Sequence, residues 1–416
     1  MSESLGQKPW MTLPATKAVM AALEAAGGEG CARFVGGCVR NSLLAEKVDD
    51  IDIATTLTPE RVIAALKQAK LKAVPTGVDH GTVTAVAEGR PYEITTLRRD
   101  VETDGRRAVV AFTEDWTEDA ERRDFRLNAL YADAAGTLYD PTGGGLADVR
   151  AGRIVFVGDS ETRIREDALR ILRFFRFQAW YGKGEPHAES LAACERLRLL
   201  VGGLSAERVS KELLKLLAAY DPRPALRLMA QTGVLAEVLP KAQGLARFER
   251  LVAIETEMLF TDDALLRLAA LLPDDPAVAA ETAQALRLSN AQRDRLVAAL
   301  QPEPKLVSWM SPREARRHVY QAGVQPFTDR VMLAWAASDR KAATTQWRAL
   351  LPLAQSWPVP SLPLTGEEVV AAGVPRGPLV GEVMREVEAW WVENDFIEDK
   401  LSIVERLKAV AQGMVY

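Results

Sequence analysis

The stretch GGCVRNSLLAEKVDDIDIAT, residues 36–55, decides the fold that the sequence predicts. Two glycines follow the apolar run ARFV at residues 32–35, and the stretch ends where acidic and aliphatic residues alternate. Alternation with a period of two is typical of a β-strand with one polar face, and paired glycines indicate a tight turn. We therefore expect a strand, a turn, a helix and a second strand in this order.

Asp50 and Asp52 are the first candidate site residues. On a strand, residues i and i+2 project to the same face, so both carboxylates should point the same way. Two like charges at so short a distance repel each other unless a cation lies between them, and Mg²⁺ is the usual oxygen-bound cation. By itself such a pair is most often a solvated strand end.

The neighbouring turn makes a metal site more specific. Gly36 and Gly37 would let backbone N–H groups approach a polyphosphate, and Arg40 would add a forked cation. An ordinary tight turn is the simpler interpretation of two glycines alone. A phosphate-binding turn beside paired carboxylates, however, is what nucleotidyl transfer with two metal ions requires.

Composition narrows the class of protein. The 416 residues are 48% hydrophobic and 26% charged, which fits a globular protein of two or more domains. No apolar run is long enough for a membrane span, and the N-terminus lacks a secretory signal. The net charge of −5 argues mildly against a broad, non-specific nucleic-acid binder, although local patches can still bind phosphate.

Cysteine and histidine counts exclude further classes. The three cysteines (Cys31, Cys38 and Cys194) have neither metal-ligand spacing nor the pattern of a disulfide framework, so we expect a cytoplasmic protein. Three histidines are too few for a His-rich metal site or an HD-type phosphohydrolase.

The chain changes character near residue 155. Before it, we expect an α/β domain with a small mixed sheet, including a hairpin of Thr82–Ala87 and Tyr92–Leu97 and another strand pair within residues 136–159. Residues 100–115 are rich in charge and are expected to form a loop. Beyond Arg163, helical periodicity continues to the C-terminus. The predicted domains are residues 1–155, 156–222, 223–355 and 356–416.

The segment REDALRILRFFRF, residues 165–177, predicts one helix with an unusual charged side. Ala168, Ile171, Leu172 and Phe175 gather on the core side. A solvated charged face with ion pairs worth ~0.2–0.5 kcal/mol each is the simple interpretation. It explains poorly why large aromatic residues fall toward the same side.

Hydrogen-bond chemistry suggests a more specific role for Asp167 and Arg170. An ionised Asp only accepts and an Arg only donates, so side by side they form an acceptor–donor edge. Cytosine and adenine present the complementary donor–acceptor pattern, whereas guanine and uracil present the reverse. Each buried mismatch costs about 1–3 kcal/mol, which is enough for the edge to select C and A.

The order of these motifs resembles a known family. GGCVRNSLL and DIDIAT are followed by HGTVTA and YEITTLR within residues 80–98, ERRDFRLNAL at 121–130, YDPTGGGLADV at 139–149 and then residues 165–177. This series resembles the polymerase β superfamily of nucleotidyltransferases, in the group of tRNA CCA-adding enzymes and bacterial poly(A) polymerases. The resemblance covers about residues 30–220.

The resemblance implies an α/β nucleotidyltransferase head (polymerase β-like, with a small mixed sheet) followed by an all-α neck, body and tail. It implies addition or repair of the 3′-terminal CCA of tRNA from CTP and ATP, with two Mg²⁺ ions; no protein partner is predicted. The family usually has Asp where this chain has Asn41, and we expect Asn41 to stabilise the turn as an Asx cap.

The candidate site residues follow from both arguments. Glu93 would be a third catalytic carboxylate beside Asp50 and Asp52 if its strand pairs with theirs, and a surface glutamate otherwise. Arg122, Arg123 and Asp124 are expected to open a helix that runs through Asn128 and Leu130. The resemblance implies that they contact the sugar and phosphates of the nucleotide; a salt-bridged surface cap is the simpler interpretation.

The remaining candidates lie further along the chain. Glu166 heads the charged side that carries the base-selecting edge, and Arg173 and Arg176 are expected either to contact phosphate or primer or to brace the acids. The turn of Gly373, Arg376 and Gly377 resembles a tail region that holds the tRNA elbow, and is otherwise a connector between helices.

Other functions stay open at this point. A poly(A) polymerase is disfavoured because residues 98–120 lack the Arg- and Phe-rich element of that group and the chain ends ERLKAVAQGMVY without a basic extension. The sequence does not exclude an enzyme that adds only C or only A, and the resemblance implies that residues 100–115 would govern that choice. A non-catalytic RNA-binding protein would not need paired metal ligands. A small-molecule nucleotidyltransferase would not need about 200 helical residues.

Overall fold

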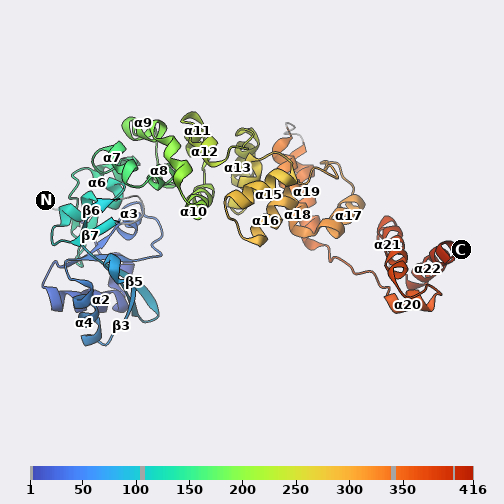
Figure 1. Cartoon of the computed structure of the whole chain (residues 1–416), viewed down its shortest axis with the longest axis horizontal. Helices are drawn as coiled ribbons and strands as arrows, with labels where there is room; N and C mark the ends of the chain where they lie inside the picture. Colours follow the sequence, from blue (N-terminus) through green and yellow to red (C-terminus); the bar gives the residue numbers. More distant parts are fainter. Residues whose placement is uncertain (1–2, 104–107, 339–342, 397–398, 416) are drawn as a thin grey trace. The chain divides into compact units, whose positions relative to one another are not determined.

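The computed structural model describes residues 3–103, 108–338, 343–396 and 399–415. The chain divides into two compact units, Met1–Pro240 and Lys241–Tyr416. The first unit begins with an α/β head, and helices form the rest of both units (Figure 1). The predicted fold class is confirmed.

The boundaries of the four predicted domains stay a prediction, and the one at residue 222 falls within the first unit. None of the described helices is long and apolar enough to cross a membrane.

Among the described residues of the head, the main sheet has the strand order β3-β4-β5-β2-β1-β8-β9. Strands β2 and β5 run parallel, and the other neighbouring pairs are antiparallel, so the sheet is mixed as expected. The strands of this sheet are β1 (Ala32–Val35), β2 (Asp52–Thr55), β3 (Lys72–Gly77), β4 (Thr82–Ala87), β5 (Arg90–Thr96), β8 (Tyr131–Ala132) and β9 (Leu138–Tyr139).

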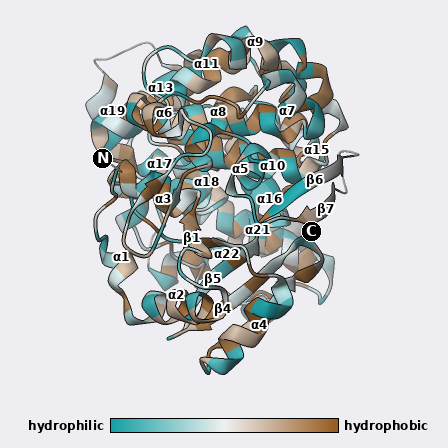
Figure 2. Cartoon of the chain, turned by 90° about the vertical axis from the view of Figure 1, so that its left-hand side faces the viewer, coloured by the Kyte–Doolittle hydropathy of each residue, from teal (hydrophilic) through white to brown (hydrophobic). Residues whose placement is uncertain are grey.

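Two amphipathic helices cover the sheet. Helices α2 (Pro14–Gly27) and α4 (Pro59–Gln68) each begin with a proline, whose fixed φ suits the first helical turn. Each helix buries one apolar face, with Leu23 and Leu66 fully buried, and both helices carry hydrophobic and hydrophilic segments in Figure 2. The short helices α1 (Pro9–Thr12) and α3 (Gly37–Leu43) complete this part of the head.

The hairpin of β4 and β5 is confirmed, but two other expectations for the head are wrong. Residues 100–115 are not simply a loop, because β6 (Arg98–Thr103) pairs with β7 (Ala108–Phe112) in an antiparallel hairpin; residues 104–107 lie outside the described residues.

Residues 136–159 contain one strand, β9, whose partner is β8. The glycines after β9 lead into helix α6 (Gly145–Ala151) instead of a second strand. The reason is local, because a carboxylate oxygen of Asp140 accepts the backbone N–H of Leu146 in the first turn of the helix.

The segment of residues 165–177 is not one helix. Helix α7 (Ser160–Glu166) ends before Asp167, whose backbone is extended, and helix α8 (Leu169–Tyr181) follows. Phe174 and Phe177 are buried with Phe125 and Phe156 of the head. Aromatic residues share the charged side of α8 because that side packs on the head.

The other helices of the first unit are α5 (Trp116–Glu121), α9 (Ala188–Arg196), α10 (Ala206–Leu217), α11 (Arg223–Gln231) and α12 (Val234–Val238). Short 3₁₀ turns occur at η1 (Val78–His80), η2 (Arg126–Asn128) and η3 (Arg198–Gly203). The helix expected from Arg122 through Leu130 is therefore reduced to the turn η2. Arg122 ends α5, and Phe125 is held in extended conformation by a bridge to Phe156.

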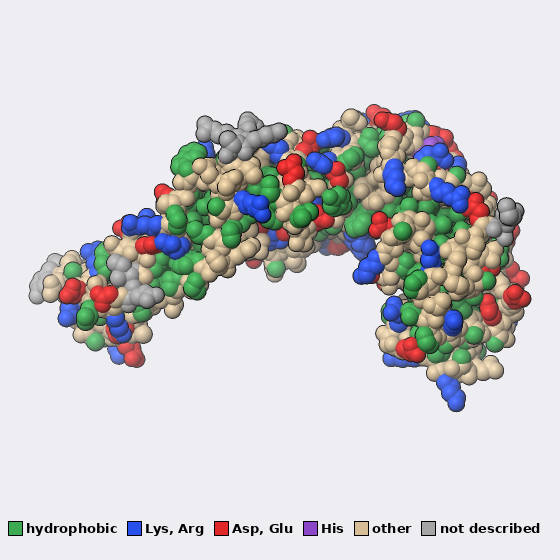
Figure 3. Space-filling model, turned by 180° about the vertical axis from the view of Figure 1, so that it is seen from behind, with side chains coloured by type: hydrophobic (Ala, Val, Ile, Leu, Met, Phe, Trp, Pro, Cys, Tyr) green, Lys and Arg blue, Asp and Glu red, His purple; other side chains and the backbone are tan. Residues whose placement is uncertain are grey.

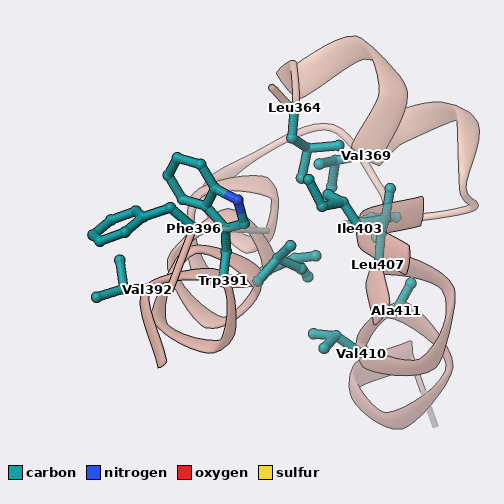
Figure 4. Close-up of a cluster of buried hydrophobic side chains, with 12 residues drawn as sticks. Leu364, Val369, Trp391, Val392, Phe396, Ile403, Leu407, Val410 and Ala411 are labelled. Carbon is teal, nitrogen blue, oxygen red and sulfur yellow. The ribbon is translucent and has the colours of Figure 1, made fainter. Parts of the chain in front are cut away.

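The second unit is helical throughout its described elements. These are α13 (Ala246–Met258), α14 (Ala264–Leu271), α15 (Pro276–Ala285), α16 (Asn290–Ala299), α17 (Pro312–Ala322), α18 (Val324–Ala337), α19 (Thr344–Ser356), α20 (Gly366–Ala371), α21 (Pro378–Glu393) and α22 (Lys400–Val415). The last three enclose an apolar core built around Trp391, Phe396, Ile403 and Leu407 (Figure 4).

Candidate active site

Asp52 lies at the centre of a group of acidic residues. It begins β2 and is the register partner of Glu93 on the parallel strand β5, whereas Asp50 lies two residues before the strand. Burial raises the pKa of Asp52 to about 6, and the negative charges of Glu93 and Asp50 contribute, against the arginines nearby. The strand pairing on which the role of Glu93 depended is thus present, although Glu93 is exposed and the regular strand starts at Asp52 and does not include Asp50.

This acidic group fits a divalent cation. Repulsion that raises the pKa of Asp52 is what a bound cation would relieve. No group of three or more His, Cys, Asp or Glu side chains is close enough for a closed metal site in the part of the chain that the structure describes. An open site of few carboxylates is typical of Mg²⁺, which is usually bound by one or two carboxylates together with substrate phosphates and water.

The turn between β1 and α3 depends on Gly36. Its φ of +69° is one that L side chains rarely adopt. A Cβ atom built there would lie 3.8 Å from the carbonyl oxygen of Asn128 and 4.0 Å from the guanidinium of Arg123. Arg123 therefore borders this turn at Gly36, and Arg40 borders it at Gly37.

Arg40 is engaged inside the protein. Its guanidinium donates to the side-chain oxygens of Asn128 and Asn41 and to the hydroxyl of Tyr181 at 2.9 Å, and it lies over the Tyr181 ring. Asn41 does not act as an Asx cap, because it lies within α3 and its carboxamide oxygen accepts from Arg40. Its amide group also donates to the carbonyl of Lys47, which holds the loop that leads to Asp50.

Arg122 and Arg123 share one buried carboxylate, that of Asp119. Both guanidinium groups lie 2.8 Å from Asp119, and the hydroxyl of Tyr131 donates to it at the same distance. Burial opposes ionisation, but the charges of Arg123 and Arg122 outweigh it and lower the pKa of Asp119 to about 2. The two arginines are thus fixed by a residue that precedes them in α5.

Asp124 and Asn128 connect the head with α8. One oxygen of Asp124 accepts the amide group of Asn128 at 3.0 Å, and the other accepts Nε of Arg173 at 2.7 Å. Burial opposes ionisation of Asp124, yet the Arg173 charge lowers its pKa. Since Asn128 also binds Arg40, a continuous polar network runs from α8 to the glycine turn.

The break between α7 and α8 sets the geometry of the predicted base-selecting edge. One oxygen of Asp167 accepts the backbone N–H of Leu169 at 3.1 Å, and the other accepts Arg208 of α10 at 2.7 Å. Arg170 pairs with Glu166 at 2.6 Å. Asp167 and Arg170 therefore lie on one turn and are each held by a different neighbour, and the side chain of Asp167 stays 30% exposed.

Arg173 and Arg176 both reach Glu212 of α10, and Arg173 also pairs with Asp124. Each arginine is thus committed to acids within the first unit. The acids that they brace are Asp124 and Glu212, not Glu166 and Asp167.

Comparison with known proteins agrees with this geometry. Residues 32–155 match the model of the poly(A) polymerase head domain, and residues 185–245 match that of a probable RNA- and SrmB-binding site of polymerase A. The chain is 32% identical to the CCA-adding enzyme of Latilactobacillus sakei over 373 residues, which cover 89% of this chain and 91% of that one. It is 30% identical to the mitochondrial CCA tRNA nucleotidyltransferase 1 of Mus musculus over 388 residues, covering 90% and 86%.

This chain belongs to the CCA-adding tRNA nucleotidyltransferases. The crystal structure of the Bacillus stearothermophilus CCA-adding enzyme in complex with CTP has a TM-score of 0.77 and 27% identity, and covers 97% of this chain and 99% of that one. The resemblance predicted from the motifs is confirmed.

The tail candidates of this CCA-adding family member lie in the second unit. Gly373 and Gly377 have φ values of +99° and +144° in the turn between α20 and α21, and Arg376 is exposed there. These three residues lie in one turn of the second unit, whereas the candidate catalytic acids lie in the head of the first unit. Lys, Arg, Asp and Glu are interspersed over the face shown in Figure 3.

Asp119, which holds Arg122 and Arg123, was not predicted from the sequence of this family member. Asp119 precedes Arg122 and Arg123 by three and four positions, a helical spacing that would have revealed the cluster. The contact between Arg208 and Asp167 left no comparable signal, because the two residues lie 41 positions apart in the sequence.

Proposed function

We propose that this chain adds or repairs the 3′-terminal CCA of tRNA, with CTP and ATP as substrates and two Mg²⁺ ions as cofactors. The observation that carries the proposal is the group of Asp50, Asp52 and Glu93, in which the pKa of Asp52 is raised by burial and by its acidic neighbours. The names of the relatives support tRNA as the substrate, and the structural relative in complex with CTP supports the nucleotide.

Asp50 and Asp52 would hold the metal ions, which when bound neutralise the triphosphate and acidify the attacking 3′-OH. Glu93, in register with Asp52, would accept the proton of that hydroxyl. Arg123 borders the glycine turn and would contact the phosphates. Gly36 and Gly37 would leave room for the triphosphate at this turn, and Arg122 would share its binding.

We assign positioning roles to the residues of the polar network. Arg40, Asp124 and Asn128 bond to one another or to α8, so they would fix the turn relative to the base-selecting edge. Arg173 and Arg176 would act on the nucleotide through Asp124 and Glu212. In the second unit, Gly373, Arg376 and Gly377 would contact tRNA.

Asp167 and Arg170 would read the incoming base. Within the described residues, Arg170 uses three N–H groups for Glu166 and for the carbonyls of Arg163 and Arg122, which leaves two donors for a base. Each oxygen of Asp167 accepts one hydrogen bond and retains a lone pair for an exocyclic amine. Glu166 would orient Arg170, as Arg208 would orient Asp167.

A charge-swapped variant tests the base-selecting edge. The readout is kcat/KM for CTP and ATP divided by kcat/KM for UTP and GTP. Asp167→Arg combined with Arg170→Asp should lower this ratio by about tenfold or more. The ratio is measured because a general loss of activity lowers both kcat/KM values by the same factor and leaves their ratio unchanged. Arg293→Asp combined with Asp294→Arg reverses an exposed pair of α16 and serves as the matched control. An unchanged ratio in the first variant would contradict the assignment.

We also propose a cytoplasmic location. The three cysteine thiols are buried and unpaired, as in proteins of a reducing compartment.

A further inference from the structure

The second unit contains a cavity that the proposed reaction does not use. It has a volume of about 540 Å³, within the range of small-molecule sites. Its walls come from the end of α16, the loop of residues 301–309, α18 and the start of α19. All of these elements belong to the unit Lys241–Tyr416.

Arg330 of α18 provides a buried positive charge at this cavity. Its side chain is only 9% exposed, and it donates to the carbonyl of Pro304. Among the residues that the structure describes, no carboxylate forms an ion pair with Arg330. Of the two nearest acidic groups, Asp274 lines the cavity but pairs with Arg247, and Glu303 accepts the backbone N–H of Lys305.

Such a group is costly unless a partner compensates it. Arg330 donates to one neutral acceptor, and its other N–H groups are not among the buried atoms without a partner, so they keep access to the cavity; burial lowers the pKa of Arg330. A bound anion would satisfy the remaining donors of the guanidinium.

Trp347 provides a second, independent observation. Its ring lines the same cavity and is 4% exposed, and its indole N–H has no acceptor among the described residues. Indole N–H groups can only donate. The cavity therefore combines two kinds of buried donor and calls for a ligand rich in acceptors.

The rest of the wall is mixed, with the polar side chains of Asp274, Gln301, Ser308 and Ser338 beside apolar ones. Leu306 and Leu333 are buried, whereas the large side chain of Trp309 is 67% exposed at the cavity. The exposed amine of Lys305 adds positive charge. An apolar body packed on these side chains would gain from removing their surface from water.

We infer that this cavity binds a small organic anion, a carboxylate carried on a planar apolar body, with the carboxylate at Arg330. The inference is independent of the proposed transfer reaction, because no residue of the head contributes to the cavity.

Titration of the full chain with 2-naphthoate, followed by isothermal calorimetry, tests the inference. The wild-type protein should bind 2-naphthoate at least about tenfold more tightly than the neutral 2-naphthamide, since only the acid pairs with Arg330. Arg330→Gln should weaken 2-naphthoate by about tenfold or more while affecting the amide little. Arg348→Gln, an exposed arginine of α19 outside the cavity wall, is the matched control.

A second variant keeps the inference testable if Arg330→Gln does not fold. Ala334→Leu keeps the arginine and fills the cavity from α18, so it should weaken both compounds. Absence of 2-naphthoate binding to the wild type, equal affinity for acid and amide, or unchanged binding by both variants would overturn the inference. Displacement of 2-naphthoate by saturating CTP would also overturn it, because the compound would then occupy the head.

Discussion

Asp52 shows how a single residue of this chain reports a site. Its raised pKa results from burial and from two neighbouring acids, so the folded chain holds negative charge where no protein cation neutralises it completely. Asp49, one residue before Asp50, differs in that it pairs with Lys47 at the surface, at 2.6 Å. Asp49 and Asp52 thus have different environments although they are only three positions apart in the sequence.

This contrast gives a prediction with its own control. Asp50→Ala and Asp52→Ala should each lower CTP incorporation into tRNA by about 1,000-fold or more, because the metal-binding charge is lost. Asp49→Ala should change the rate less than about threefold, as expected for an exposed pair. Single-turnover rates with radiolabelled CTP provide the measurement. A comparable loss in all three variants would argue against a special role for Asp50 and Asp52.

Asp119 gives a second prediction, on stability and pH. Its pKa in the folded chain, about 2, lies below the ordinary value, so its contribution is complete above about pH 4 and is lost as the pH falls toward 2. Asp119→Asn should destabilise the chain by about 3 kcal/mol at pH 7, because Arg122 and Arg123 lose their buried partner.

Thermal unfolding of wild type and Asp119→Asn at pH 7 and at lower pH provides the measurement. The difference in Tm between them should shrink as the pH falls from 4 to 2. A difference that is independent of pH would show that the carboxylate charge of Asp119 is not what stabilises the cluster.

Features set by residues that are near in the sequence were easier to predict than contacts between residues that are far apart in it. The strand that begins at Asp52 was predictable, because strand alternation is a local pattern, whereas its pairing with the Glu93 strand was left open and Asp50 lies outside the regular strand. The partners of Arg40 were not predictable, because Tyr181 and Asn128 lie 141 and 88 positions away. A pattern in the sequence gives the residue type at a site but not the distant group that it contacts.

At the scale of elements, the break at Asp167 separates two roles of the segment 165–177. Charge periodicity runs through the break without interruption, so the sequence predicts one helix where the chain forms α7 and α8. The break becomes understandable in three dimensions, because the extended Asp167 caps Leu169 and meets Arg208 of α10. The α10 contact is long-range and overrides the local helical pattern.

Helix α8 is fixed to the head by aromatic packing, which gives a third prediction. Phe174 is fully buried and contacts Phe156 and Phe125, whereas Trp180 on the same helix is 48% exposed. Phe174→Ala should destabilise the first unit by about 3–5 kcal/mol through loss of contacts and a cavity. Trp180→Ala should cost about 1 kcal/mol, corresponding to its hydrogen bond with the carbonyl of Lys215.

Urea unfolding followed by circular dichroism measures both free energies. Equal effects of the two substitutions would contradict the conclusion that the charged side of α8 packs on the head.

At the scale of the whole molecule, the chain consists of two compact units with separate cores. Trp391 is buried in the core formed by α20, α21 and α22 (Figure 4), and Phe174 lies in the first unit. The helical character of the second unit was predictable from Leu and Ala content, but the position of its boundary, between Pro240 and Lys241, was not. Boundaries depend on which helices pack together, and short connections of similar composition occur throughout.

The two units should unfold separately, which is a fourth prediction. Differential scanning calorimetry should resolve two transitions, and Trp391→Ala should lower one while Phe174→Ala lowers the other. If both substitutions shifted a single transition by the same amount, the units would not be independent.

CCA addition by this chain is tested most directly with tRNA that lacks the terminal CCA, CA or A. Each substrate is incubated with the protein and Mg²⁺ in the presence of CTP, ATP, both, or UTP with GTP, and the 3′ ends are sequenced. This chain should complete CCA on each substrate, add no further nucleotide, and use neither UTP nor GTP. Open-ended A tails, or indiscriminate addition of all four nucleotides, would contradict this prediction.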